Sequence, residues 1–423
     1  MNEIDFNTNQ KHTDDKLTRN EFREEKSAMK KTGRYISTYC TGCGLCHSVQ
    51  GTELKTIAGG FPSADIKNDE SLDFYTSVCP VFYYKEEGKH DVWGIIKKAL
   101  VGYSADDVIR FQAASGGALT EICCYLLENN EVDAIIHTTF DPDDQTKTIS
   151  CISTTIEQVM SRCGSRYGIS VPLKNILQIV DKNKKYAFIG KPCDVMALRR
   201  YLDKNEKLKK NIIYLLSFFC AGEPSAKAQD ELLKKMGTSR EQCDNLTYRG
   251  NGWPGLTTAI TKDGRELKME YKIAWGQYLG RDIRYICRFC MDGTGDLADI
   301  VCADFWQLDS NNQPDFSEHE GRNIIIARTD IGKQLLDNTV KSGRIHVEED
   351  FTSKIDSEFH LYQPAQLKRK GTMKSSIMAM KLCGRDTPEY SKSFLDKYAS
   401  HTKLKVKFDF FIGIIKRIIK GRL

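Results

Sequence analysis

Short apolar runs alternate with amphipathic stretches through the middle of this chain. Val132–His137, Tyr186–Gly190, Ile212–Phe219 and Asn323–Arg328 are runs of this kind. Apolar runs of about four to eight residues that end in glycine, proline or small polar residues are typical of buried strands. Because helical patterns lie between them, we predict an α/β fold with a mostly parallel sheet and crossover helices.

Three other patterns predict local elements. Asp91–Tyr103 carries apolar residues at helical spacing, which predicts a helix. Thr257–Ile260 and Glu266–Met269 flank an Asp-Gly turn, which predicts a β-hairpin. Phe408–Leu423 places its apolar residues on one helical face and its basic residues elsewhere. A basic amphipathic helix can lie on an anionic membrane surface, pack on the protein's own core or bind a partner helix.

The composition is that of a soluble globular protein, with 40% hydrophobic residues. The chain has 62 basic and 57 acidic residues, and this small excess gives no support for nucleic-acid binding. No apolar run reaches the roughly 18–20 residues of a membrane span, and the polar N-terminus contains no secretory signal. We therefore expect a cytoplasmic protein without a nucleic-acid partner. Its C-terminal helix is the candidate for peripheral contact with the inner face of the membrane.

The chain has 15 cysteines and no export signal, which favours metal ligands and core thiols over disulfides. Cys40, Cys43 and Cys46 have the Cys-x-x-Cys-x-x-Cys spacing with which bacterial ferredoxins hold a [4Fe–4S] cluster. Cys79, which precedes a proline, is the candidate fourth ligand. A zinc site with the same four thiolates is the alternative, although zinc more often binds two well-separated Cys-x-x-Cys motifs.

A second group of four cysteines is predicted to converge. Cys193 and Cys220 each follow a predicted strand, and Cys287 and Cys290 form another Cys-x-x-Cys motif. In open α/β sheets the chemistry lies beyond the carboxyl ends of the strands. Four thiolates meeting there suit an iron–sulfur cluster or zinc.

Two loops are candidates for binding a cofactor. Ser115–Thr120 opens a predicted helix, whose N-terminal amides can bind a phosphate or can simply start the helix. Gly164–Tyr167 follows another predicted helix, either as a C-cap or as a contact for a cofactor phosphate or ring. The chain contains neither Gly-x-Gly-x-x-Gly nor a Walker lysine motif, so a standard Rossmann nicotinamide site has no support. The candidate cofactor-binding residues are Ser115, Gly116, Gly117, Thr120, Gly164, Ser165, Arg166 and Tyr167.

These motifs occur in the same order in one known family. The chain resembles the beta subunit of coenzyme F420-reducing hydrogenase and its relatives, from about Tyr35 to His346. It departs from the family pattern at Arg166, where lysine is usual, and at Asp194, where glutamine is common. The shared motifs are Ser115–Thr120, Gly164–Tyr167, Gly190-x-Pro-Cys193, Phe219-Cys220, Tyr248–Gly255, Cys287-x-x-Cys290 and Ala298–Ile300.

The resemblance implies an iron–sulfur flavoprotein oxidoreductase. It implies FAD, rather than FMN, beside the two candidate loops. One [4Fe–4S] cluster would be bound by the group Cys193, Cys220, Cys287 and Cys290, and a second by the group Cys40, Cys43, Cys46 and Cys79. Electrons would pass between ferredoxin, or another redox protein, and coenzyme F420 or another small-molecule substrate. No catalytic residue is identified.

The expected segments follow from the resemblance together with the polar N-terminus and the amphipathic C-terminus. They are a flexible segment at 1–31, a ferredoxin-like 4Fe-4S domain at 32–90, a flavin and 4Fe-4S domain at 91–346, an extension at 347–402 and a basic amphipathic helix at 403–423. Three alternatives stay open. They are a reductase that acts on a polysaccharide precursor, an electron-transfer subunit that only relays to a partner, and a non-catalytic scaffold with two four-cysteine zinc sites.

Overall fold

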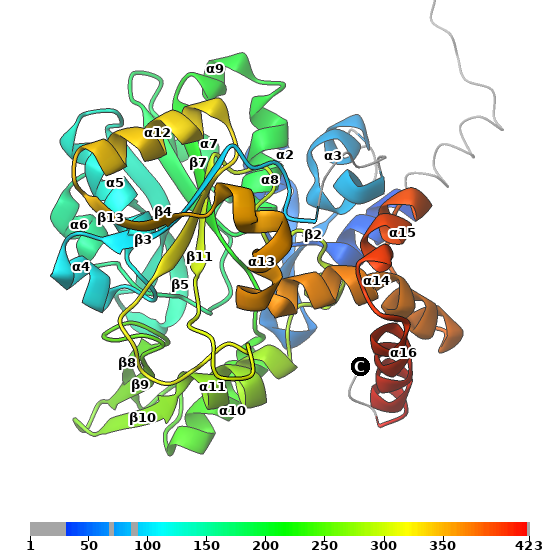
Figure 1. Cartoon of the computed structure of the whole chain (residues 1–423). Coiled ribbons are helices and arrows are strands. Elements are labelled where there is room, and N and C mark those ends of the chain that lie inside the picture. The colour runs from blue at the N-terminus through cyan, green and yellow to red at the C-terminus, as the bar shows by residue number, and fades with distance from the viewer. Residues whose placement is uncertain (1–30, 67–71, 86–91, 421–423) are drawn as a thin grey trace, which may run out of the picture.

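The computed structural model describes residues 31–66, 72–85 and 92–420, and its centre is one mixed sheet of eight strands (Figure 1). The strands β11, β7, β6 and β4 are neighbours that pair in parallel, whereas the strands outside them pair antiparallel. The α/β class is therefore confirmed, with parallel pairing confined to the centre of the sheet. In spatial order the strands are β13 (Ile345–Asp350), β3 (Lys98–Ser104), β12 (Asn323–Ala327), β11 (Ile300–Asp304), β7 (Ile212–Phe218), β6 (Tyr186–Gly190), β4 (Ala134–Asp141) and β5 (Asp144–Ser153).

Helices cover both faces of this sheet, because successive strand residues point to opposite sides. Ile135 and the strand residues that point to the same face pack against α5 (Ala118–Glu128), α6 (Ile156–Met160) and α12 (Asp330–Lys341). Ile136 and the strand residues of the opposite face point to the side where α8 (Pro192–Leu202) and α13 (Ile355–Tyr362) lie. Figure 1 shows this three-layer arrangement, with α5 and α12 on one side and α8 and α13 on the other.

The predicted helix at Asp91–Tyr103 is wrong. Its second half is the strand β3, which lies inside the sheet between β12 and β13. Leu100 packs on one face of the sheet and Val101 on the other, so consecutive residues are apolar, the alternation of a half-buried strand is lost and the pattern imitates helical spacing. Gly102 is needed for close pairing, because a Cβ atom there would lie 2.3 Å from the carbonyl oxygen of His346.

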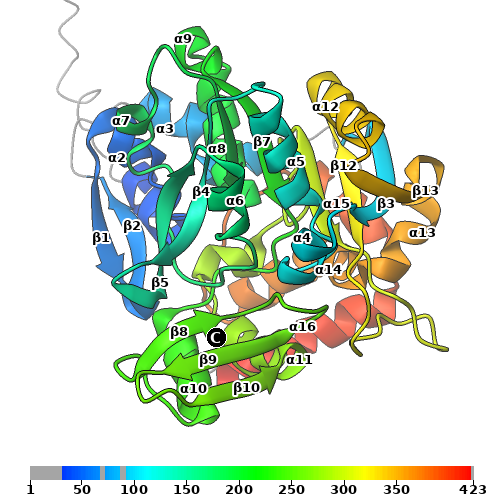
Figure 2. The same ribbon diagram turned by 90° about the vertical axis from the view of Figure 1, so that its left-hand side faces the viewer.

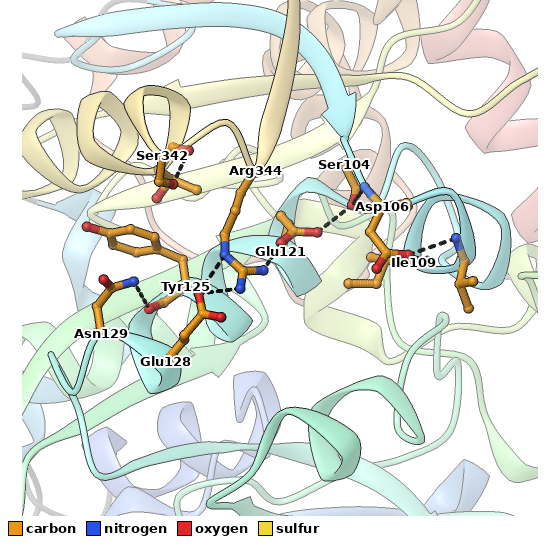
Figure 3. Close-up of polar contacts among 11 residues, drawn as sticks. Ser104, Asp106, Ile109, Glu121, Tyr125, Glu128, Asn129, Ser342 and Arg344 are labelled. Atoms are coloured by element: carbon orange, nitrogen blue, oxygen red, sulfur yellow. Dashed lines mark hydrogen bonds and ion pairs between the residues drawn. The ribbon is translucent and has the colours of Figure 1, made fainter.

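A buried ion-pair network holds helix α5 in place (Figure 3). The carboxyl group of Glu121 is almost fully buried and accepts hydrogen bonds from the Ser104 hydroxyl and from Arg344, each at 2.5 Å. Arg344 also donates to Glu128, two turns further along the same helix. The network therefore ties α5 to the end of β3 and to the residue that precedes β13.

A second, smaller sheet lies below the first (Figure 2). Its strands are β10 (Glu266–Glu270), β9 (Leu256–Thr261) and β8 (Cys243–Thr247), and α10 (Ala226–Met236) packs beside them. Strands β9 and β10 pair antiparallel, which confirms the predicted hairpin. The remaining short helices of the large domain are α4 (Asp107–Gln112), α7 (Ile176–Ile179), α9 (Glu206–Lys209) and α11 (Tyr271–Ile273).

The N-terminal part contains residues 31–39, which are helical, and a two-stranded antiparallel sheet. Its elements are α2 (Leu45–Gln50), β1 (Glu53–Ile57), β2 (Phe61–Asp65) and α3 (Leu72–Val78). Its ferredoxin-like character stays a prediction, and the predicted flexible segment at 1–31 lies almost entirely outside the described residues.

After α13 the chain ends in three more helices, namely α14 (Pro364–Leu382), α15 (Lys392–Ser400) and α16 (Leu404–Ile419). Part of the apolar face of α16 packs on α14, so the helix rests on the protein's own surface (Figure 1). Strand β13 crosses the boundary that we expected at residue 346. Within the described ranges, none of the helices has both the length and the apolar character that crossing a bilayer requires.

Candidate functional site

A large pocket opens beyond the carboxyl ends of the central strands. Its volume is about 550 Å³, and His137, Gly190, Phe218 and Cys302 bring the ends of β4, β6, β7 and β11 to its wall. This is the edge at which open α/β sheets bind their ligands. The size is that of pockets that bind cofactors or other small molecules.

Most of the predicted cofactor-binding residues meet in this pocket. Seven of the eight line it, namely Ser115, Gly117, Thr120, Gly164, Ser165, Arg166 and Tyr167. Gly116 does not, because it packs against the loop before β12, where a Cβ atom would lie 2.9 Å from Oδ1 of Asn323. The same Asn323 oxygen accepts a hydrogen bond from the Ala118 amide, so one of the free N–H groups at the start of α5 is already used.

Arg166 has a structural role that the sequence did not reveal. Its guanidinium group donates to three backbone carbonyls, of Leu246, Gln145 and Lys147, and lies 5.2 Å from the ring centre of Tyr248. Burial lowers its pKa. Arg166 thus joins β5 to the small sheet and shapes the pocket wall.

One end of the pocket is a stack of aromatic rings around a buried ion pair. Trp306 lies parallel to Trp253 at 4.8 Å between ring centres, and Tyr271 lies nearly parallel to Trp306 at 6.2 Å. Arg249 forms two hydrogen bonds with the carboxylate of Asp304, at 2.9 and 3.0 Å, and its guanidinium group lies 4.5 Å from the Tyr271 ring centre. Planar ligands pack favourably against faces of this kind.

The wall formed by β4 and β5 carries a buried histidine. Nε2 of His137 lies 2.7 Å from the Ser153 hydroxyl, which also receives a hydrogen bond from Arg162. Burial first, and the Arg162 charge second, lower the pKa of His137 to about 4. His137 is therefore a neutral hydrogen-bonding group at neutral pH.

Beside the large pocket is a smaller cavity of about 60 Å³ that all four cysteines of the second group line, namely Cys193, Cys220, Cys287 and Cys290. Lys191, Cys220, Gly222 and Glu223 line both spaces and form their common wall. Burial and the neighbouring Cys287 raise the pKa of the Cys220 thiol to about 12. A thiol with so high a pKa loses its proton only when a strong positive charge, such as that of a bound metal, lies beside it and stabilises the thiolate.

The first group of cysteines lies close by. Burial raises the pKa of Cys43 and of Cys79, and thiols of the same group raise both further. The turn at Gly42, with φ of 76°, brings its amide 3.4 Å from Sγ of Cys40. Thr41 lines the second group's cavity, so the two groups of thiols are neighbours.

Buried charges connect the two groups and the pocket. Nζ of Lys191 lies 3.0 Å from Asp194 and 3.4 Å from Glu223, and Glu223 also accepts a 2.6 Å hydrogen bond from Arg284. Arg284 in turn donates to the carbonyl oxygen of Cys40. Burial alone would lower the pKa of Lys191, but Asp194 and Glu223 raise it, so the amine stays charged.

Sequence reasoning found the thiols and the two loops and missed most of these polar partners. The sequence did offer an indication for Asp194, because the family usually has glutamine at that position. It offered no indication for Glu223 or Arg284, because their partners lie far away in the chain. In the part of the chain that the structure describes, no group of three or more His, Cys, Asp or Glu side chains is arranged to hold a single metal ion.

Comparison with protein families covers the large pocket and the second group of cysteines, but not the first group. Residues 99–178 match the N-terminal model of the coenzyme F420 hydrogenase/dehydrogenase beta subunit, and residues 183–351 match its C-terminal model. The chain belongs to this family. The resemblance that the motifs indicated is therefore confirmed.

The relatives are distant in sequence. The chain is 25% identical to the chloroplastic 7-hydroxymethyl chlorophyll a reductase of Oryza sativa over 75% of its own length and 65% of that protein. It is 24% identical to the coenzyme F420-dependent sulfite reductase of Methanocaldococcus jannaschii, covering 58% of this chain and 37% of that enzyme. It is 22% identical to the coenzyme F420 hydrogenase subunit beta of Methanococcus voltae, covering 70% and 99%.

The chain therefore spans less than two thirds of the first two relatives and almost all of the third. Among solved structures it is similar to the F420-reducing [NiFe] hydrogenase complex from Methanosarcina barkeri. The TM-score is 0.48 at 18% identity, over 67% of this chain and 96% of the other chain.

Proposed function

We propose that this protein is an iron–sulfur flavoprotein oxidoreductase. It would pass electrons between a one-electron donor such as ferredoxin and a hydride-accepting substrate. Coenzyme F420 is the first candidate, because relatives in the family carry it in their names. Another small molecule, such as a polysaccharide precursor, is the alternative substrate. We propose a cytoplasmic location.

One observation carries this proposal. Cys220 lines both the four-thiol cavity and the large pocket, so a group bound by the thiols would be adjacent to a group bound in the pocket. Thr41, between two cysteines of the first group, reaches the same cavity. Two sites for electron carriers next to a pocket for a flavin and substrate are what an electron-transferring reductase needs.

The donor sets fit the cofactors that the family implies. Four thiols in each group, most of them buried, suit iron, for which sulfur is the usual ligand in clusters. Zinc also binds four thiolates, but it more often uses two well-separated Cys-x-x-Cys motifs than the Cys-x-x-Cys-x-x-Cys spacing of Cys40, Cys43 and Cys46. The zinc scaffold is therefore the weaker alternative.

The pocket fits a flavin in size and in the chemistry of its wall. A bound flavin supplies the exchange between one-electron and two-electron transfer. The aromatic end would hold a planar ring, and the buried pair of Arg249 and Asp304 would keep that end rigid. Lys191 keeps a positive charge in the wall that the pocket shares with the thiol cavity.

Anaerobic purification with analysis of iron, sulfide, zinc and released flavin tests the proposal. We expect about eight irons and one FAD per chain. Cys220→Ser and Cys46→Ser should each remove about four irons, whereas Cys383→Ser, outside both groups, should remove none. A colourless protein that contains zinc and no flavin would refute the redox function.

A second pair of variants tests the pocket alone. Ser165→Trp would place a large ring in the pocket, and we expect it to lower the FAD content while the iron content stays unchanged. Ser161→Trp, on an exposed residue that does not line the pocket, is the matched control. Turnover with reduced ferredoxin and F420 then separates a reductase from a subunit that only relays electrons to a partner.

A further inference from the structure

The C-terminal helix α16 exposes a strip of large apolar side chains. Leu404 is 79% exposed, Phe408 62% and Ile419 78%, on a protein whose other large apolar residues are mostly buried. Spacings of four and eleven residues bring the three to one side of the helix. Large apolar side chains that are exposed on one side of a helix are candidates for a site of interaction.

The protein covers the middle of the apolar face of α16 and leaves these three residues exposed. Phe411, Ile414, Ile415 and Ile418 pack into the cluster that α14 and α15 form. Leu404 and Phe408 lie in the first turns of the helix and Ile419 is its last residue, so the contact with α14 and α15 leaves both ends of the apolar face exposed. Figure 1 shows the helix at the edge of the molecule.

Charge around the strip has one dominant sign. From the N-cap of α16 to its C-cap the chain carries one acidic residue, Asp409, and six basic ones, namely Lys403, Lys405, Lys407, Lys416, Arg417 and Lys420. Helical geometry puts Lys405 and Lys416 beside the exposed strip. Within the described ranges, none of the six basic side chains forms an ion pair with a carboxylate, so their charge is available.

We propose that α16 docks this protein on an anionic lipid surface. The strip of Leu404, Phe408 and Ile419 would enter the boundary between headgroups and acyl chains, while the lysines contact anionic headgroups. A second copy of the chain is a poorer occupant, because it would bring two strongly basic helices face to face. This proposal does not depend on the redox chemistry.

Sedimentation of the full-length, anaerobically purified protein with vesicles tests it. We expect binding to vesicles of phosphatidylcholine with phosphatidylglycerol and little binding to phosphatidylcholine alone. The triple variant Lys405→Gln, Lys416→Gln, Lys420→Gln should bind about 100-fold more weakly, since each basic residue contributes about fivefold. The variant Leu404→Ser, Phe408→Ser, Ile419→Ser should lose at least about tenfold.

A control changes three other apolar residues that are more than half exposed, on another part of the molecule, Ile95→Ser, Val108→Ser and Phe111→Ser. Vesicle binding that survives in this control and falls in both α16 variants supports the proposal. Absence of binding to anionic vesicles overturns it, as does equal binding to neutral vesicles. Dimerisation that depends on the three apolar residues, without vesicle binding, assigns the strip to a second copy and also overturns it.

Discussion

Replacing Arg344 with methionine removes the cation that contacts the buried carboxyl group of Glu121 (Figure 3). Methionine retains much of the apolar stem, so the main loss is the charge and its hydrogen bonds. Glu121 would keep the Ser104 hydroxyl as a partner. The perturbation therefore tests whether α5 depends on a buried ion pair.

The magnitude follows from burial. Removing one member of a buried pair costs about 3–5 kcal/mol. The side chain of Arg344 is 24% exposed and that of Glu121 is 1% exposed, so water weakens the interaction from one side, and we expect about 2–3 kcal/mol.

Native-state hydrogen exchange measures this loss where it occurs. The amides of α5 should exchange about 30- to 150-fold faster in Arg344→Met, while those of α8 on the other face of the sheet should change little. Glu128→Gln is the matched control, because it removes only the partner that is 52% exposed and should change exchange by less than about fivefold.

A double variant separates a lost pair from a lost side chain. Glu121→Gln combined with Arg344→Met leaves no buried charge behind, so it should recover part of the exchange protection. The reasoning is refuted if Arg344→Met changes the exchange of α5 no more than Glu128→Gln does.

Three further predictions rest on other buried groups. Gly42→Ala should destabilise the protein by about 1–2 kcal/mol in urea unfolding, because φ is 76° there and a Cβ atom would lie 2.4 Å from Nη2 of Arg284. The pKa of His137 falls from 6.5 to about 4 on folding, so the unfolded chain binds the proton more tightly. Stability should drop by about 3 kcal/mol as the pH falls through that range, and His137→Gln should remove this drop. Asp304→Asn leaves the buried guanidinium of Arg249 without a carboxylate and should cost about 3 kcal/mol in urea unfolding.

Each of these has a sharp counter-test. Gly51→Ala shares the positive φ of Gly42 but meets no atom within 4 Å, so an equal loss in both would rule out the contact with Arg284. An unchanged pH profile in His137→Gln would show that the histidine does not titrate as its burial implies. Asp263→Asn breaks an exposed pair with Arg265 and should cost less than about 1 kcal/mol, so a comparable effect from Asp304→Asn would contradict a buried pair.

Local patterns in the sequence determined much of this protein. Runs such as Tyr186–Gly190 and the hairpin around the Asp-Gly turn follow from side-chain pattern and turn chemistry, which act over a few residues. The ordered motifs identified the family, and the families' models confirm it. Cysteine spacing likewise indicated two groups of thiols, and the structure brings the second group around one cavity.

Long-range pairing decided the rest. Lys98–Ser104 is a strand because β12 and β13 flank it, and burial on both faces erases the alternation that would have distinguished it from a helix. Long-range pairing also placed antiparallel strands on both sides of the parallel centre of the sheet, which local patterns in the sequence do not specify. Glu223 became a partner of Lys191 and Arg284 only when three distant segments met, since a buried charge is stable only beside its opposite. Folding also decided that the protein covers the middle of the apolar face of α16 and leaves Leu404, Phe408 and Ile419 exposed to solvent.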